Sequence, residues 1–473
     1  MKKIMTRLLS LVLLGAFIPS FVLADNWDLD KGSITVSATV ESQTVSQAGG
    51  SSTVDNNPVI TSSSGKTNNT VTITAEKNAT ANVTLENVNI DTGTTDEAAI
   101  TTSGEGKVNI ELNGTNTVQS GNTHAGVEKK GDGTLTITDE DKDGSLTATG
   151  GNYGAGIGGG SLGSGSNIAI EGGKVEASSV GGGAGIGGGS LGSGSNITVS
   201  GGEVTAQGGV GGAGIGGGQG GSGSNITISD GKVTATGAGA GAGIGGGYEG
   251  SGKGITIEGG EVTAQGDTGG AGIGGGISGT GSDVTISGDA QVKVQGGAAD
   301  ERWKEGAAIG NGGTRTTEGN EVSPNTSDLT VEGSIQIYEP GKNINTDTPD
   351  KTIEGQKGDH SWNAGEVTTA ETVPESKAAA YWVSDSQGQS IPYQAQQKDG
   401  VLTVTVQADT ASLRGTTGSL GQLEAQGVAE IRFVTNGAQS AFTLADLLAS
   451  GTGSFTLTHE AETVRFTLAE KDI

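Results

Sequence analysis

A seven-residue sequence, Gly-Ala-Gly-Ile-Gly-Gly-Gly, recurs five times in this chain at a constant interval. The copies begin at Gly154, Gly183, Gly212, Gly241 and Gly270. A fixed period of this length is typical of a solenoid, because one unit cannot bury its own apolar face and must stack on a copy of itself. The repeat therefore constrains the fold more strongly than any other feature of the sequence.

Within each repeat, apolar and polar residues alternate, as in Ile197-Thr198-Val199 and Val204-Thr205-Ala206. This period of two indicates β-strands. Glycine saturates the rest of the unit, and glycine is a poor helix former that favours tight corners. We therefore expect an all-β fold, a right-handed parallel β-helix with 29-residue coils and three short strands in each coil.

Stacking the coils in register at about 4.8 Å places equivalent residues in columns. Three columns of Ile and Val are predicted to point inward: Ile157, Ile186, Ile215, Ile244 and Ile273; Ile170, Val199, Ile228, Ile257 and Ile286; and Val175, Val204, Val233, Val262 and Val292. On the outer surface the charge alternates along Lys174, Glu203, Lys232 and Glu261. Exposed ion pairs contribute little to stability, so we expect this column mainly to fix the register of the coils.

The N-terminal segment, residues 1–24, has the pattern of a secretory signal peptide: three cations, then an apolar run, then a small-residue cleavage site ending at Ala24. Pro19 and Ser20 interrupt the apolar run, which argues against a membrane anchor. No later segment approaches the roughly 20 apolar residues needed for a membrane span. The sequence thus predicts a secreted, extracellular protein, and its last residues, Glu-Lys-Asp-Ile, predict no sortase-type anchor.

The amino-acid composition and net charge disfavour some classes of binding partner. The chain has 91 Gly, no Cys and a formal charge of −27, which becomes −30 without the three cations of residues 1–24. The lack of Cys excludes a disulfide scaffold and favours a bacterial source for a secreted protein. Nucleic acid and anionic membranes are poor partners for such an acidic surface, because both require basic patches.

The period also suggests domain boundaries. Residues 25–60 are expected to form an N-terminal cap, and strand patterns from about residue 61 to 340 predict the β-helix. Ile100, Val127 and Ile157 follow the period only approximately, and the equivalent of Ile273 comes late, at Ile309. Residues 341–375 resemble a linker or irregular cap. Residues 376–473 are predicted to be a small, mostly antiparallel β module with a short helix from Leu444 to Ser450.

The repeated texture, Gly-Ala-Gly-Ile-Gly-Gly-Gly followed by Asn-Ile-Thr-Ile and Gly-Gly-Glu-Val-Thr-Ala, resembles the glycine-rich repeats of secreted and surface proteins from gut Firmicutes. It is similar, more loosely, to secreted carbohydrate-binding proteins with the right-handed, pectate-lyase-like β-helix. The resemblance covers about residues 65–340 and includes no catalytic signature. It implies the fold, and a role in glycan binding or at the cell surface.

Enzymatic chemistry has few candidate residues in the coils. Pectate-lyase-like enzymes use an Arg or Lys base and calcium held by Asp clusters, but no Arg lies between Arg7 and Arg302. A glycosidase needs two facing carboxylates about 5 to 9.5 Å apart. Glu203 and Glu261 are two coils apart, yet Lys232 lies between them. We therefore lean against an enzyme, and keep a polysaccharide lyase or glycoside hydrolase as the alternative.

One acidic turn could bind a metal ion. The run Asp139-Glu-Asp-Lys-Asp-Gly144 has alternate carboxylates, Asp139, Asp141 and Asp143, on a glycine turn, an arrangement that can wrap a calcium ion. Against this, position 12 of such a loop is Gly150 instead of Glu, and Lys142 reduces the charge. An acidic, solvated turn and a weak structural calcium site both remain open. The histidines, His124, His360 and His459, have no metal-ligand spacing, and surface or structural roles are expected for them.

Aromatic residues that could stack on sugars are scarce in the repeats. Tyr153 and Tyr248 occupy different positions in their coils and are not expected to form a platform. Trp303, in the insertion from Ala298 to Glu305, is the best single candidate for ligand binding, and burial at the end of the core is the alternative. The sequence as a whole favours a secreted, non-catalytic β-helix whose repetitive surface binds a polysaccharide or a host or bacterial surface glycan. A purely structural stalk is a third interpretation.

Overall fold

The chain forms two compact units, Met1–Glu371 and Thr372–Ile473. The computed structural model describes residues 26–314, 329–331, 333–354 and 361–362 of the first unit, and 381–385, 391, 393–398, 400–416, 423–424, 427–445, 454–460 and 463–469 of the second. The predicted signal peptide, residues 1–24, and His360 lie outside these ranges. Among the described residues, no helix is long and apolar enough to cross a membrane.

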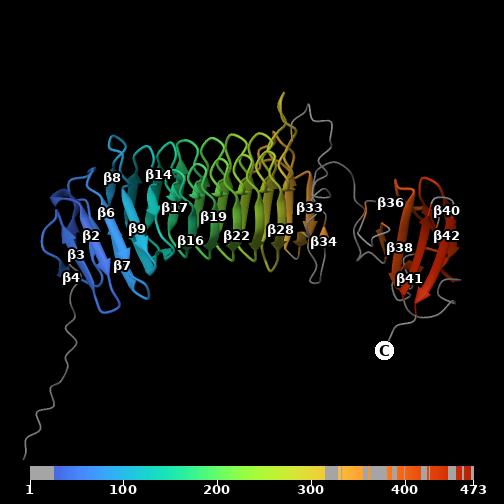
Figure 1. The fold of residues 1–473 in the computed structure, drawn as a ribbon, viewed down its shortest axis with the longest axis horizontal. Coiled ribbons are helices and arrows are strands. Elements are labelled where there is room, and N and C mark those ends of the chain that lie inside the picture. The colour runs from blue at the N-terminus through green and yellow to red at the C-terminus, as the bar shows by residue number, and fades with distance from the viewer. Residues whose placement is uncertain are drawn as a thin grey trace, which may run out of the picture. The chain divides into compact units, whose positions relative to one another are not determined.

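The first unit is a parallel β-solenoid of about 12 turns with ~29-residue coils, as the repeat predicts. Its strands stack side by side along the unit, from the blue coils to the orange coils in Figure 1. Three sheets, here named A, B and C, run along the stack. Sheet A contains, in spatial order, β1 (Asn26–Asp28), β5 (Val59–Thr61), β7 (Thr80–Glu86), β10 (Lys107–Asn113), β13 (Thr134–Thr138), β16 (Gly165–Ile170), β19 (Gly194–Val199), β22 (Gly223–Ile228), β25 (Gly252–Ile257), β28 (Gly281–Ile286), β31 (Leu329–Val331) and β34 (Ser361–Trp362).

Sheets B and C complete the coil. Sheet B contains, in spatial order, β30 (Ile309–Gly310), β27 (Ile273–Gly274), β24 (Ile244–Gly245), β21 (Ile215–Gly216), β18 (Ile186–Gly187), β15 (Ile157–Gly158), β12 (Val127–Lys129), β9 (Ile100–Gly104), β6 (Val71–Ala75), β2 (Ile34–Ala38), β3 (Gln43–Gln47) and β4 (Thr53–Val54). Sheet C contains β33 (Lys351–Glu354), β32 (Ser334–Tyr338), β29 (Gln291–Gln295), β26 (Glu261–Gln265), β23 (Lys232–Thr236), β20 (Glu203–Gln207), β17 (Lys174–Ser179), β14 (Ser145–Gly150), β11 (Thr115–Gln119) and β8 (Asn89–Asp91).

The core is the set of inward columns that the alternation predicts. All members of the three predicted Ile and Val columns are buried, and they belong to one apolar cluster that runs the length of the solenoid. The irregular spacings also keep their register, because Val127 pairs with both Ile100 and Ile157, and Ile273 pairs with Ile309. Extra residues are therefore accommodated outside the strands of sheet B.

Glycine is required where the coils come closest together. In sheet B, Gly216 has a φ of 133°, and a Cβ atom there would lie 2.0 Å from the carbonyl oxygen of Gly245 in the next coil. Glycine tolerates this backbone conformation and leaves room for the neighbouring chain. In sheet A, a column of asparagines occupies positions with left-handed backbones: Asn167, Asn196 and Asn225. Their side-chain amides are hydrogen bonded from coil to coil, at 3.0 and 3.2 Å.

In each of the three sheets, an antiparallel strand lies at one end and a parallel strand at the other. The segment expected to be a cap, residues 25–60, contributes β1 and β2 to parallel ladders, with a short 3-10 helix, η1 (Leu29–Lys31), between them. Only β3 and β4 run antiparallel there. At the other end, β33 and β34, from the expected linker, pair antiparallel with β32 and β31. The parallel ladder of each sheet therefore ends at the antiparallel strand.

The second unit contains two four-stranded sheets. One holds β35 (Tyr381–Ser384), β38 (Thr410–Thr416), β41 (Ser454–Glu460) and β42 (Thr463–Ala469), all antiparallel. The other holds β36 (Gln394–Lys398), β37 (Val401–Thr405), β39 (Glu430–Val434) and β40 (Gln439–Thr443), in which β37 and β39 are parallel. Residues 444 and 445 are helical, where the predicted helix begins, and residues 446–450 lie outside the described residues.

One histidine links the two sheets of the second unit. His459 of β41 is fully buried against Phe433 of β39, with ring centroids 4.7 Å apart. Its Nδ1 is 3.1 Å from the hydroxyl of Thr435 and its Nε2 is 2.7 Å from the hydroxyl of Ser440. Burial lowers the pKa of His459 below its ordinary value. This histidine therefore has the structural role that the sequence suggested for it.

Candidate functional site

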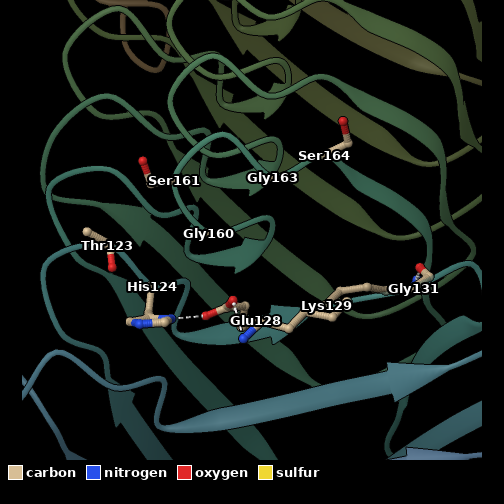
Figure 2. A pocket seen from close by; sticks show the side chains of 10 residues that line it. Thr123, His124, Glu128, Lys129, Gly131, Gly160, Ser161, Gly163 and Ser164 are labelled. Carbon is tan, nitrogen blue, oxygen red and sulfur yellow. Dashed lines mark hydrogen bonds and ion pairs between the residues drawn. The ribbon is translucent and has the colours of Figure 1, made fainter.

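A pocket of about 390 Å³ lies where the irregular coils meet the glycine-rich repeats. It is lined by Thr123, His124, Glu128, Lys129, Lys130, Gly131, Gly160, Ser161, Gly163 and Ser164. Figure 2 shows His124, Glu128 and Lys129 along one side and Ser161 and Ser164, from the next coil, on the other. The pocket thus joins charged groups of one coil to hydroxyl groups of its neighbour.

A buried carboxylate organises the charged side of this pocket. The side chain of Glu128 in β12 is only 5% exposed. One carboxylate oxygen is hydrogen bonded to Nδ1 of His124, and the other lies 2.9 Å from Nζ of Lys130. The ammonium group of Lys129 donates to the carbonyl oxygen of Gly131 at 2.8 Å, and burial lowers the pKa of Lys129, an effect partly opposed by Asp132. A buried charge needs partners of this kind.

Glu128 is buried by the next coil, although it alternates with the inward Val127. Glu128 pairs with Thr101 in the preceding coil and with Gly158 in the following one. The loop after Gly158 covers the carboxylate, and a Cβ atom on Gly160 would lie only 3.1 Å from Oε1 of Glu128. The glycines of the first regular repeat therefore make room for a carboxylate that the later coils replace with glycine.

A second concave surface, the sheet C groove, has a volume of about 670 Å³ and lies across β23, β26, β29 and β32. Two outward columns cross its floor: Thr234, Thr263, Lys293 and Gln336; and Lys232, Glu261, Gln291 and Ser334. Asp289 lines it from the turn before β29, and Asn345 lines it from the loop after β32. Hydroxyl, amide and charged groups therefore alternate over four neighbouring coils.

The loop that carries Asn345 is held in place by a buried glutamine. Gln295, at the end of β29, is 1% exposed and donates from Nε2 to the carbonyl oxygens of Glu339 at 2.6 Å and Lys342 at 3.1 Å. Its Oε1 accepts from Gln265 of the preceding coil at 2.8 Å. An ion pair between Lys342 and Asp350 closes the same loop. One wall of the sheet C groove is therefore fixed before any ligand arrives, which lowers the cost of binding.

The coils beside these two surfaces match a known repeat family. A family model described as beta helix repeat matches residues 142–161, 168–190, 197–219, 226–248 and 255–277. These segments are beta helix repeats. Comparisons with curated proteins and with solved structures gave no match.

The acidic turn at the start of the first beta helix repeat, Asp139 to Gly144, does not bring its carboxylates together. Asp139 uses Oδ2 to accept from the backbone N–H of Gly144 at 3.2 Å, which closes the turn, while Asp141 and Asp143 are exposed. Among the residues described, no group of three or more His, Cys, Asp or Glu side chains could hold a metal ion. Calcium binding at this turn stays a prediction to be tested in solution.

Trp303 lies beside an aromatic residue of a beta helix repeat. Its ring meets that of Tyr248 edge to face, with centroids 6.3 Å apart, and both side chains are half-buried. Asp300 accepts the backbone N–H groups of Arg302 at 2.7 Å and Trp303 at 2.8 Å, which orders the turn of the insertion. The sequence did not associate Tyr248 with Trp303, because Trp303 lies in the insertion that breaks the period. Ligand binding by Trp303 stays a prediction.

The predicted charge column is correct in register but not in every ion pair. Lys174, Glu203, Lys232 and Glu261 are neighbours in successive strands. Lys232 pairs with Glu203 at 2.8 Å, which raises the pKa of Lys232 and lowers that of Glu203. Lys174 instead pairs with Glu176 of its own strand at 2.9 Å. Both residues project from the same face of β17, and this nearer carboxylate satisfies the ammonium group.

The cluster around Glu128 was not predicted from the sequence. His124, for which a surface or structural role was expected, is hydrogen bonded to a buried glutamate one strand position away from the inward Val127. The available signal was the run Val127-Glu-Lys-Lys130, where charged residues follow an inward valine at a sheet B position that is glycine in the beta helix repeats. A charge at such a position indicates a local function or a compensating partner.

Proposed function

We propose that this protein is a secreted, non-catalytic β-solenoid that binds extracellular glycans in the sheet C groove, as an adhesive or carbohydrate-binding protein. The groove itself carries this proposal. It spans four coils, it is lined mainly by hydroxyl, amide and charged side chains, and the loop carrying Asn345 is held by Gln295. Fixed polar groups in a concave surface are what orient a ligand with many hydroxyl groups.

The balance of charge in the sheet C groove favours a neutral glycan. Its lining contains two cations, Lys232 and Lys293, and two anions, Glu261 and Asp289. Lys232 is already paired with Glu203 outside the groove. Since the chain as a whole carries a charge of −27, a polyanionic glycan would be repelled from its surface unless cations intervened.

The regular spacing of the coils suits the binding of an extended, linear glycan. Equivalent side chains recur at about 4.8 Å, the spacing of neighbouring strands. A linear glycan laid across the strands would meet a new row of polar groups at each coil, so that several weak contacts add along one chain. We propose that this mode of binding, rather than a single deep site, determines affinity.

The cellular part of the proposal rests on residues 1–24, whose cations, apolar run and small-residue end suit a secretory signal. The resemblance of the glycine-rich repeats to those of secreted and surface proteins of gut Firmicutes, and to pectate-lyase-like carbohydrate-binding proteins, supports the same location and ligand class. Mass spectrometry of culture medium from the native host, or of a periplasmic extract from an expression host, would test it. Detection only of intact chain in the cytoplasm would reject secretion.

A blocking variant tests the groove. Thr263→Trp places a large outward side chain on the groove floor, and affinity electrophoresis against neutral polysaccharides such as xylan and glucomannan measures the effect. We expect the wild-type chain to be retarded by at least one neutral polysaccharide and Thr263→Trp to bind it roughly tenfold more weakly.

Thr205→Trp is the matched control, because Thr205 occupies the same outward column as Thr234 and Thr263 but does not line the groove. It should bind as the wild type does. Equal weakening in both variants would place binding elsewhere on sheet C. No retention of the wild type by any polysaccharide would favour a purely structural stalk.

A further inference from the structure

The pocket around Glu128 presents hydrogen-bond donors. The carboxylate of Glu128 already accepts from His124 and Lys130 with its two oxygens. The lining also carries the ammonium groups of Lys129 and Lys130, each of which makes one of these contacts or one to Gly131 and has further donor hydrogens, and the hydroxyl groups of Ser161 and Ser164. Ammonium groups donate only, and hydroxyl groups can donate, so the pocket is suited to a ligand rich in acceptors.

The charge of this lining has the opposite sign to that of the chain. Two lysines and one glutamate line the pocket, which leaves one net positive charge even when His124 is neutral. Lys129 is 5% exposed, so its ammonium group interacts with a ligand in a medium less polar than water. Asp132 lies near enough to influence Lys129, and Asp96 accepts from Thr123 at 3.0 Å, but neither lines the pocket.

We propose that this pocket is a binding site for a small oxyanion group, a carboxylate or a sulfate, carried by a ligand such as an acidic sugar. Lys129 and Lys130 bind the anion, Ser161 and Ser164 donate from the opposite side, and Glu128 positions Lys130 and His124. This site shares no residue with the sheet C groove, so either proposal can fail while the other stands.

Replacing Glu128 should raise the anion affinity of the pocket, whereas most substitutions in a binding site lower it. If Glu128 only positions its neighbours, then Glu128→Gln removes a negative charge beside the anion while its amide oxygen can still accept from Lys130. Anion binding should then strengthen by about threefold or more. If Glu128 instead accepts hydroxyl groups of a neutral ligand, the same substitution weakens binding, which would contradict the proposal.

Titration calorimetry of the full chain at low salt tests the site with four ligands: sodium sulfate, acetate, glucuronate and glucose. We expect saturable binding of at least one anion and none of glucose. Lys130→Gln, at a side chain 52% exposed, should weaken anion binding at least tenfold, and Lys129→Gln should do the same. Tighter binding of glucuronate than of acetate and sulfate would identify an acidic sugar, and equal binding would identify the bare anion; both support an oxyanion site.

Lys174→Gln is the matched control, because Lys174 also pairs with a glutamate, at 2.9 Å, but lines neither this pocket nor the sheet C groove. Its anion affinity should equal that of the wild type. The proposal is overturned if the wild type binds none of the anions, if Lys174→Gln weakens binding as much as Lys130→Gln does, or if glucose binds as tightly as glucuronate.

Discussion

Replacing Gly216 by alanine should disrupt the solenoid at the centre of its regular coils. Gly216 has a φ of 133°, and its new Cβ would lie 2.0 Å from the carbonyl oxygen of Gly245. Contacts below 3.0 Å are essentially never seen for real Cβ atoms, so the two coils must separate locally. That oxygen accepts from the backbone N–H of Gly217 at 2.9 Å, so the separation breaks a hydrogen bond between coils.

The expected loss can be estimated from two contributions. Placing a side chain at positive φ costs about 1 kcal/mol. Leaving the buried N–H of Gly217 and the carbonyl of Gly245 without partners costs about 1 to 3 kcal/mol for each group. The free energy of unfolding should therefore fall by about 3 to 7 kcal/mol, a large effect for one methyl group.

Gly49→Ala is the control, because it introduces a side chain at positive φ without a steric clash of the new Cβ atom. Gly49 also has a positive φ, of 72°, but a Cβ atom there would meet nothing within 4 Å. Urea unfolding followed by far-ultraviolet circular dichroism should show a loss of about 1 kcal/mol for Gly49→Ala. If Gly216→Ala is no more destabilised than Gly49→Ala, the coils do not approach as described and the reasoning is refuted.

Four further outcomes are expected. Ile215→Asp, which buries an unpaired charge in the core, should be severely destabilising, whereas Lys232→Ala on the surface should change the urea midpoint far less; equal losses would contradict the assignment of inside and outside. If Asp139, Asp141 and Asp143 bind calcium, chelator should lower the melting temperature and Asp141→Asn should abolish that decrease, whereas an unchanged melting temperature would favour the solvated turn. Because burial lowers the pKa of His459, the second unit should be stable above about pH 6.5 and lose stability as the pH falls below that value, as hydrogen exchange of the full chain would reveal, and His459→Gln should remove this dependence. Incubation with pectate, alginate, xylan or glycosaminoglycans should produce neither an ultraviolet-absorbing double bond nor new reducing ends above a heat-inactivated control.

The sequence alone determined the parts of this protein that obey the period. In a solenoid the neighbours of a residue lie one repeat away, so moving one period along the chain from Ile186 identifies Ile215 as its partner without knowledge of the tertiary structure. The alternation of apolar and polar residues then assigned inside and outside, and the predicted Ile and Val columns are buried. Even the irregular intervals around Val127 kept their register, because the strands stay paired while the loops between them take up the difference in length.

Only the tertiary structure decided what happens where the period ends. Glu128 is buried because the glycine loop of the next coil covers it, and no spacing in the sequence relates Glu128 to Gly160. Tyr248 contacts Trp303, which lies in an insertion that the period does not place. Lys174 pairs with Glu176 rather than Glu203 because the nearer carboxylate lies on its own strand. Local pattern specifies which face a side chain occupies, but loop paths and competition between partners at similar distances are settled by packing in three dimensions.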